Sequence, residues 1–177
     1  GDHRDLHSFP TRRSSDLLSL VWGLYDYRLA SIPLFVPPGH ALLLLLGFLV
    51  AARLGDWVVW AVPLAALPFV AILLSSGAGT LDGVLFALFV ACILLGSARR
   101  LSALMFVLAL AMEIYGTWLG TWSWPADVPW LGLTSVTPPL AAGAFYCVLD
   151  MLVVTTVSRL HASAARAERL PSAVSVR

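Results

Sequence analysis

The chain has 177 residues, of which 59% are hydrophobic and only 12% are charged, and its formal net charge is +1. With a mean hydropathy of +0.87, this composition lies outside the range of soluble globular domains and indicates a membrane protein. The balanced charge gives no basic patch, which argues against nucleic acid as a partner. Both cysteines lie in apolar stretches, where a thiol is typically a small hydrophobic group, so neither a disulfide nor a metal role is expected.

Residues 1–17 read GDHRDLHSFPTRRSSDL and are similar, codon by codon, to a translated adaptor used in short-read DNA sequencing. We therefore expect residues 1–17 to be a leader that is not native. The expected organisation is then a transmembrane domain over 18–158 and a basic cytoplasmic tail over 159–177.

Five apolar stretches are long enough to cross a bilayer core of about 30 Å at about 1.5 Å per residue. Because unpaired backbone groups are too costly in lipid, each stretch predicts a helix. Ahead of them, residues 18–24 are apolar and a polar break follows at 25–28, which predicts the end of a further helix. The expected fold is an all-α polytopic membrane bundle of five complete transmembrane helices plus the remnant of an N-terminal sixth. The five predicted helices are Gly39–Leu54, Trp57–Ser75, Thr80–Gly96, Leu101–Leu119 and Pro139–Val157.

The arginines predict the orientation, because cytoplasmic loops of bacterial membrane proteins are enriched in Arg and Lys. Seven arginines fall on one side of the predicted bundle, and Arg28 falls on the other. We therefore expect a cytoplasmic C-terminus, with segments 28–38, 75–79 and 120–138 facing outward. The chain lacks lysine and is dominated by Leu, Ala, Val and Arg, as in proteins from GC-rich bacterial genes, so we expect a bacterial inner membrane. The seven arginines on the cytoplasmic side are Arg53, Arg99, Arg100, Arg159, Arg166, Arg169 and Arg177.

The outward segment 120–138 combines three tryptophans, Trp122, Trp124 and Trp130, with several prolines. Two interpretations remain open. The first is an aromatic belt, because Trp settles at headgroup depth and Pro is common at helix ends. The second is a stiff aromatic lid over the outer end of the bundle.

Two carboxyl groups, Asp82 and Glu113, are expected near that outer end. Asp82 lies in the first turn of its helix, where it complements the positive helix end. Glu113 shares a helix face with Gly116 and Gly120, which is typical of contact with a neighbouring helix. If the two carboxyls approach each other, their repulsion keeps a proton on one of them and provides a general acid in an apolar pocket. The alternative is two independent structural acids.

Other polar or aromatic residues extend this candidate site. His40 begins the first helix on the same side as Asp82 and Glu113. Asp150 shares a helix face with Tyr146 and is expected to face the bundle interior, either bonded to Tyr146 or an arginine or placed in a proton or substrate path. No helix has His-x-x-x-His or Glu-x-x-His spacing, so no metal and no cofactor are expected. The candidate substrate-binding residues are His40, Tyr115, Trp122, Trp124, Tyr146 and Asp150.

One short motif carries a resemblance. Glu113-x-x-Gly116, followed by Trp122-x-Trp124, resembles the Glu-x-x-Gly and aromatic-x-aromatic pattern of the membrane carotenoid-biosynthesis family that includes the carotenoid hydratases. Those polytopic proteins add water across a terminal double bond of a long polyene. The resemblance implies an intramembrane enzyme acting on an isoprenoid or carotenoid-type substrate, with Glu113 as the acid. Trp122 and Trp124 stand where the family pattern has tyrosines.

Two functions follow from these observations, since the sequence carries none of the motifs of nucleotide hydrolysis or of soluble hydrolases. The first is acid catalysis on a hydrophobic substrate, with Glu113 and Asp82 as proton donors. The second is a small proton-coupled carrier or non-catalytic accessory subunit, in which Asp82, Glu113 and Asp150 form a path. Both functions imply the lipid bilayer as a partner, and the first function also implies a hydrophobic small molecule as its substrate.

Overall fold

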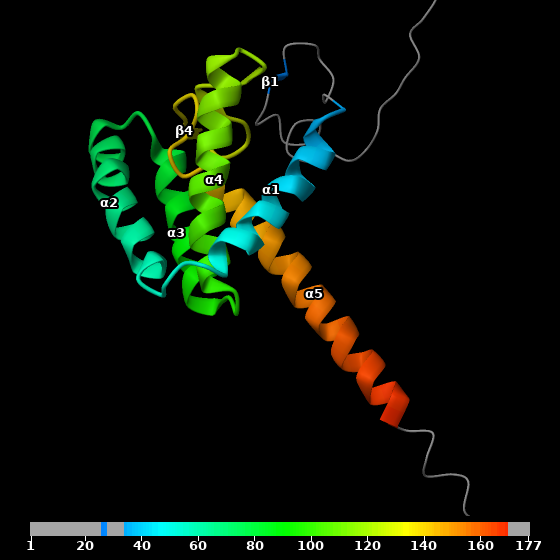
Figure 1. The fold of residues 1–177 in the computed structure, drawn as a ribbon. Helices are drawn as coiled ribbons and strands as arrows, with labels where there is room; N and C mark the ends of the chain where they lie inside the picture. Colours follow the sequence, from blue (N-terminus) through cyan, green and yellow to red (C-terminus); the bar gives the residue numbers. More distant parts are fainter. Residues whose placement is uncertain (1–25, 28–33, 170–177) are drawn as a thin grey trace, which may run out of the picture.

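The computed structural model describes residues 26–27 and 34–169 (Figure 1). The expected leader 1–17, the helix remnant 18–24, Arg28 and the end of the tail lie outside them. The described residues form five helices, which confirms the prediction of a helical bundle. The elements are β1 (Asp26–Tyr27), α1 (Val36–Ala51), α2 (Val58–Ser76), α3 (Thr80–Leu95), α4 (Arg99–Trp118), β2 (Trp122–Ser123), β3 (Asp127–Val128), β4 (Leu133–Thr134) and α5 (Gly143–Arg169).

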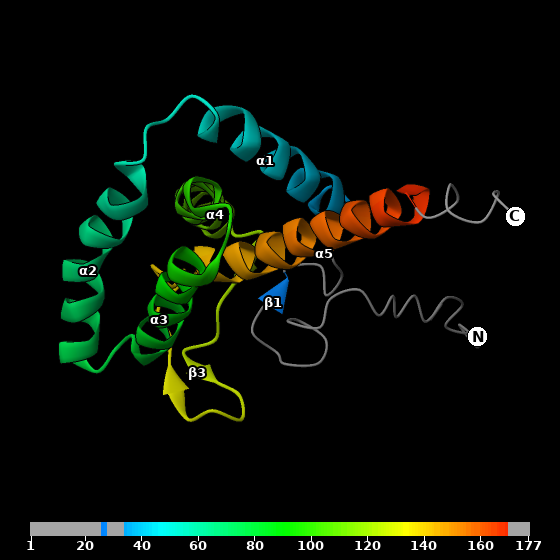
Figure 2. The same cartoon turned by 90° about the horizontal axis from the view of Figure 1, so that it is seen from below.

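Successive helices run in opposite directions, so both ends of the bundle are made of connections between neighbouring helices (Figure 1). Helix α4 lies in the middle and packs against the other four described helices (Figure 2). Its buried side chains accordingly cover one broad face, and Val107, Ile114 and Tyr115 on the opposite side are exposed.

Three of the five described helices are long and apolar enough to cross a membrane: α2, α4 and, over Gly143–Arg166, α5. Helices α1 and α3 have 16 residues each, and a helix of that length spans about 24 Å, less than the hydrocarbon core. The protein is therefore a membrane protein, but the expectation of five complete spans is not confirmed. Many large apolar side chains, such as Leu42 and Leu64 at 66% exposed each, cover the outside of the bundle as lipid contact requires.

Helix termini follow local chemistry. Helix α1 begins at Val36, three residues before the predicted start, because Pro37 and Pro38 occupy its first turn, where a missing N–H costs nothing. Helix α2 ends at Ser76, and the next residue, Gly77, caps it with a φ of 71°, the left-handed conformation that favours glycine. Helix α5 begins at Gly143 rather than Pro139 and continues well past Val157.

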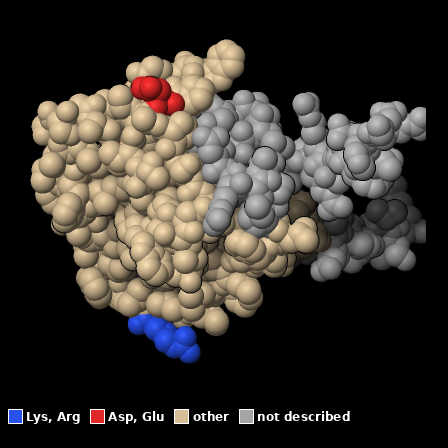
Figure 3. All heavy atoms as spheres, turned by 90° about the horizontal axis from the view of Figure 1, so that it is seen from above, with Lys and Arg blue, Asp and Glu red and all other residues tan. Residues whose placement is uncertain are grey.

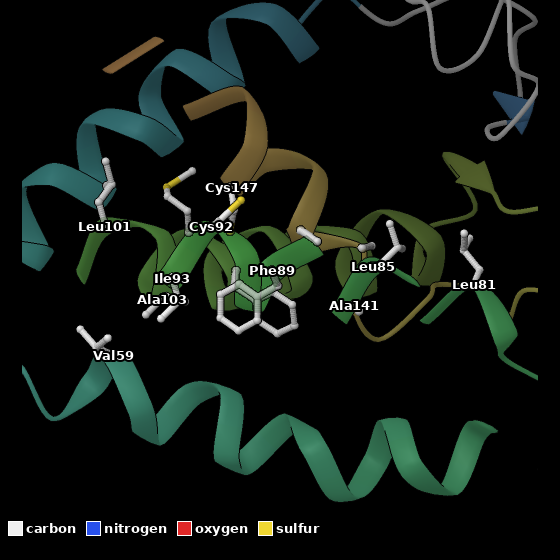
Figure 4. Close-up of a cluster of buried hydrophobic side chains, with 14 of the residues drawn as sticks. Val59, Leu81, Leu85, Phe89, Cys92, Ile93, Leu101, Ala103, Ala141 and Cys147 are labelled. Atoms are coloured by element: carbon white, nitrogen blue, oxygen red, sulfur yellow. The ribbon is translucent and has the colours of Figure 1, made fainter. Parts of the chain in front are cut away.

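The core is built on α4 by close helix approach and aromatic packing. A Cβ on Gly47 of α1 would lie 2.6 Å from the Met105 sulfur, and one on Gly143 of α5 would run into the Phe106 backbone. Phe106 also stacks on Phe89 of α3, with ring centroids 4.1 Å apart. Phe89 lies in the middle of the buried cluster shown in Figure 4. Glycines at the helix contacts thus let α1 and α5 approach α4.

Residues 119–142, between α4 and α5, form a folded cap over one end of the bundle. Strands β3 and β4 pair as a hairpin, and β2 pairs with β1. The Thr134 backbone N–H donates to the Thr80 hydroxyl at 2.7 Å, and the Thr134 hydroxyl donates to the Gly77 carbonyl at 2.9 Å. These bonds hold the hairpin against the connection between α2 and α3.

The described surface in Figure 3 is almost uncharged and carries acidic and basic groups only at its margins.

The opposite end carries the arginines and is called the arginine end below. Arg100 donates to the Leu54 carbonyl at 2.9 Å and pairs with Asp56 at 3.2 Å, which joins the two connections at that end. Arg53 and Arg99 bond to carbonyls of the preceding helices, which are the negative ends of α1 and α3.

Candidate functional site

The Glu113 carboxyl is fully buried at the cap end of α4 and accepts hydrogen bonds on both oxygens. The indole N–H of Trp122 donates to Oε2 at 2.8 Å, and that of Trp124 donates to the same oxygen at 3.1 Å. The Tyr146 hydroxyl donates to Oε1 at 3.1 Å. One carboxyl therefore joins α4, the cap and α5.

Gly116 makes this arrangement sterically possible. It lies one turn after Glu113, and a Cβ at residue 116 would collide with the Trp122 ring. The Gly116 face, expected to contact a neighbouring helix, thus receives an indole from the cap. The four residues of the sequence motif, Glu113, Gly116, Trp122 and Trp124, form one contact cluster.

His40 and Phe145 extend the cluster through ring stacking. The His40 ring lies nearly parallel to Tyr146, with centroids 4.5 Å apart and an interplanar angle of 9°. Trp124 stacks on Phe145 at 6.2 Å. His40 thus joins Glu113 indirectly, because its ring supports the tyrosine that donates to the carboxyl.

Two of the aromatic residues singled out in the sequence lie outside this cluster. Tyr115 is 60% exposed, and its ring faces Trp118 rather than Glu113. Trp130 is 90% exposed, near the turn of the β3–β4 hairpin. The belt interpretation therefore fits Trp130, whereas Trp122 and Trp124 point inward and bind Glu113 as a lid would.

Asp82 is also fully buried, in the first turn of α3. Its Oδ1 accepts the backbone N–H of Ala141 at 2.6 Å. Among the described residues, Oδ2 has no hydrogen-bond partner. Ala141 lies in the turn that leads into α5, so the carboxyl faces the positive ends of two helices, α3 and α5.

Asp82 and Glu113 have different partners within the described part of the chain, and no hydrogen bond joins them. Both act on the start of α5: Asp82 holds the backbone at Ala141, and Glu113 holds the side chain of Tyr146. The two carboxyls are therefore connected through one helix rather than through a shared hydrogen bond.

An apolar groove of about 290 Å³ lies between α2, α4 and the end of the cap. Its rim includes Phe69, Ile72 and Ile114, which are 59%, 64% and 52% exposed. Sequence reasoning missed this groove because its walls come from three separate segments whose apolar residues look like any lipid-facing surface. The lining residues are Phe69, Ile72, Leu73, Leu110, Ile114, Val136, Pro138 and Leu140.

Asp150 lies apart from both carboxyls, at the arginine end. It is 9% exposed and borders a cavity of about 10 Å³ together with Ser97 and Ser102. That volume accommodates about one water molecule. Tyr146, a partner expected for Asp150, donates to Glu113 instead. Among the described residues, no group of three or more His, Cys, Asp or Glu could hold a metal ion.

Comparisons with protein-family models, curated proteins and solved structures give no significant match to this chain. The function is therefore argued from the groove, the two buried carboxyls and the arginine end.

Proposed function

We propose that this protein is a multi-pass membrane enzyme that adds water to the terminal double bond of an isoprenoid or carotenoid-type chain by acid catalysis. The observation that carries the proposal is the apolar groove between α2 and α4, which lies at the same end of the bundle as two buried carboxyls. Ile114 in its wall directly follows Glu113, and Leu140 directly precedes Ala141, the partner of Asp82. A hydrocarbon in the groove would therefore lie at the end of the bundle that holds both acids.

The size of the groove favours one end of a chain as its occupant. Its volume is at the lower limit of small-molecule sites, which begin at about 300 Å³. The exposed rim residues Phe69, Ile72 and Ile114 open it toward lipid. A long polyene would thus place its terminus in the groove and leave the rest in the bilayer, as chemistry at a terminal double bond requires.

The reaction needs only an acid and water. The acid transfers its proton to the terminal alkene carbon, and the electron pair of the double bond forms the new C–H bond. The neighbouring carbon becomes a carbocation, to which the oxygen of a water molecule bonds. The second proton of that water returns to the carboxylate and restores the acid. The alkene and one water thereby become one alcohol.

The positions of the arginines support a proposed orientation of the protein in the membrane. Arg53, Arg99 and Arg100 all lie at that end, opposite the cap. By the positive-inside rule we place this end and the C-terminus in the cytoplasm of a bacterium and the cap on the periplasmic side. We further propose that α1 and α3 cross together with α2, α4 and α5.

The test is product formation in cells that make a linear carotenoid with terminal double bonds. Expression of the protein is expected to yield a carotenoid that has gained one water, detected by mass spectrometry. Leu110→Trp, which fills the groove, is expected to abolish product. Leu64→Trp adds the same side chain at a lipid-facing position of α2, 66% exposed, and is expected to leave product formation intact. No product from the wild-type protein, or equal product from both variants, would refute the proposal.

A further inference from the structure

Resting on the proposed function, we infer that Asp82 is the proton donor of this site, whereas Glu113 holds the aromatic cap in place. The sequence motif alone points to Glu113 as the acid. The contacts of the two carboxyls favour the opposite assignment.

Asp82 does not line the groove itself but lies close to Leu73, which does. The position that a Cβ on Gly79 would occupy is 3.0 Å from Leu73 Cβ and 3.1 Å from Asp82 Oδ2. Because residue 79 is a glycine, no side chain of that residue stands between Asp82 and Leu73, which lines the groove. This role of Asp82 requires that the Leu73 side chain, whose Cδ1 is 3.4 Å from that position, rotates to open the carboxyl to the groove.

Asp82 can also carry and release a proton without loss of its hydrogen bond. Its Oδ1 accepts the Ala141 N–H, and its Oδ2 is fully buried with no partner in the described part of the chain. A proton on Oδ2 therefore breaks no hydrogen bond to the described residues. When the Oδ2–H bond breaks and the proton moves to the alkene carbon, the Ala141 N–H and the positive ends of α3 and α5 stabilise the carboxylate that forms.

Glu113 lacks these properties. An indole N–H only donates, so Oε2, which faces Trp122 and Trp124, acts as an acceptor for both. A proton on Oε1 would be directed at the Tyr146 hydroxyl. None of these three aromatic partners lines the groove, and both oxygens of Glu113 already accept hydrogen bonds from them.

The experiment compares isosteric amide variants in vesicles that contain a linear carotenoid, with the rate of hydration as the readout. Asp82→Asn keeps an oxygen for the Ala141 N–H but has no acidic proton, so the rate is expected to fall at least about 100-fold, the effect of losing a general acid. Glu113→Gln is expected to stay within about tenfold of wild type, since an amide can keep the same three hydrogen bonds. Asp56→Asn, at an exposed acid of the arginine end, serves as the control for the change from a carboxyl to an amide.

A variant with Asp82 intact covers the case in which Asp82→Asn does not fold. Gly79→Ala places a methyl group between Asp82 and Leu73 and is expected to lower the rate at least about tenfold, because it separates donor from substrate. Full activity of folded Asp82→Asn or of Gly79→Ala, or loss of activity in Glu113→Gln alone, overturns the assignment and leaves the proposed function standing. A wild-type protein that forms no product overturns both.

Discussion

The hydrogen bonds of Glu113 predict that leucine and glutamine at this position have very different effects on stability. Glu113→Leu removes the acceptor of three buried bonds, from Trp122, Trp124 and Tyr146. At about 0.5 to 1.5 kcal/mol per bond, the free energy of unfolding should fall by roughly 2 to 4 kcal/mol. Glu113→Gln should change it by less than about 1 kcal/mol, because its oxygen can accept both indoles while its NH₂ group donates to the Tyr146 hydroxyl.

The measurement is unfolding of the purified protein in detergent by increasing SDS, followed by tryptophan fluorescence. Asp150→Leu is a matched control, because it also replaces a buried carboxyl, one whose Oδ2 has no partner among the described residues. Asp150→Leu should lower the free energy of unfolding by less than Glu113→Leu does. The reasoning is refuted if Glu113→Leu is as stable as wild type. It is equally refuted if Glu113→Gln loses as much stability as Glu113→Leu, since the hydrogen bonds would then not account for the loss.

Three further changes test the cap. Gly116→Ala should lower the free energy of unfolding by about 1 to 3 kcal/mol in the same assay, because its Cβ would collide with the Trp122 ring. Gly39→Ala, whose Cβ would meet no atom within 4 Å, is the control and should leave stability unchanged. Thr134→Val removes the hydroxyl that ties the hairpin to the Gly77 carbonyl, so cap amides should exchange hydrogen faster, and unchanged exchange would contradict this role. Trp130→Cys should react with a membrane-impermeant maleimide added to intact spheroplasts, with little background since both native cysteines are buried; labelling only after permeabilisation would reverse the proposed orientation.

The helices were predictable because apolar stretches and polar breaks alternate clearly along the chain. The predicted start of the third helix at Thr80 agrees with α3. The predicted helix boundaries are wrong where the helix propensity of individual residues differs from what the hydropathy of the segment indicates. The first helix was predicted to begin after Pro37 and Pro38, but both fit a helical first turn. Beyond Val157 the apolar pattern fades, yet Ala and Arg are strong helix formers, and α5 continues.

The candidate site was predictable only in part. The spacing of Glu113 and Gly116 indicates one helix face, and the aromatic-x-aromatic pattern marks Trp122 and Trp124 as a unit. The sequence does not indicate that both indoles turn inward to a single oxygen. The partner of Asp82 is a backbone N–H 59 positions away, at Ala141, and a backbone donor leaves no mark in a sequence.

The cap also accounts for the short helices. A 16-residue helix covers about 24 Å of a hydrocarbon core of about 30 Å, so α1 and α3 would leave polar helix ends in lipid if nothing covered them. Both begin under residues of the cap or of α5: Thr80 at the start of α3 bonds to Thr134, and His40 near the start of α1 stacks on Tyr146. Irregular backbone is tolerated at membrane depth where protein surrounds it. With α1 and α3 in the membrane as proposed above, these contacts of the cap and α5 would keep the starts of the two short helices out of lipid.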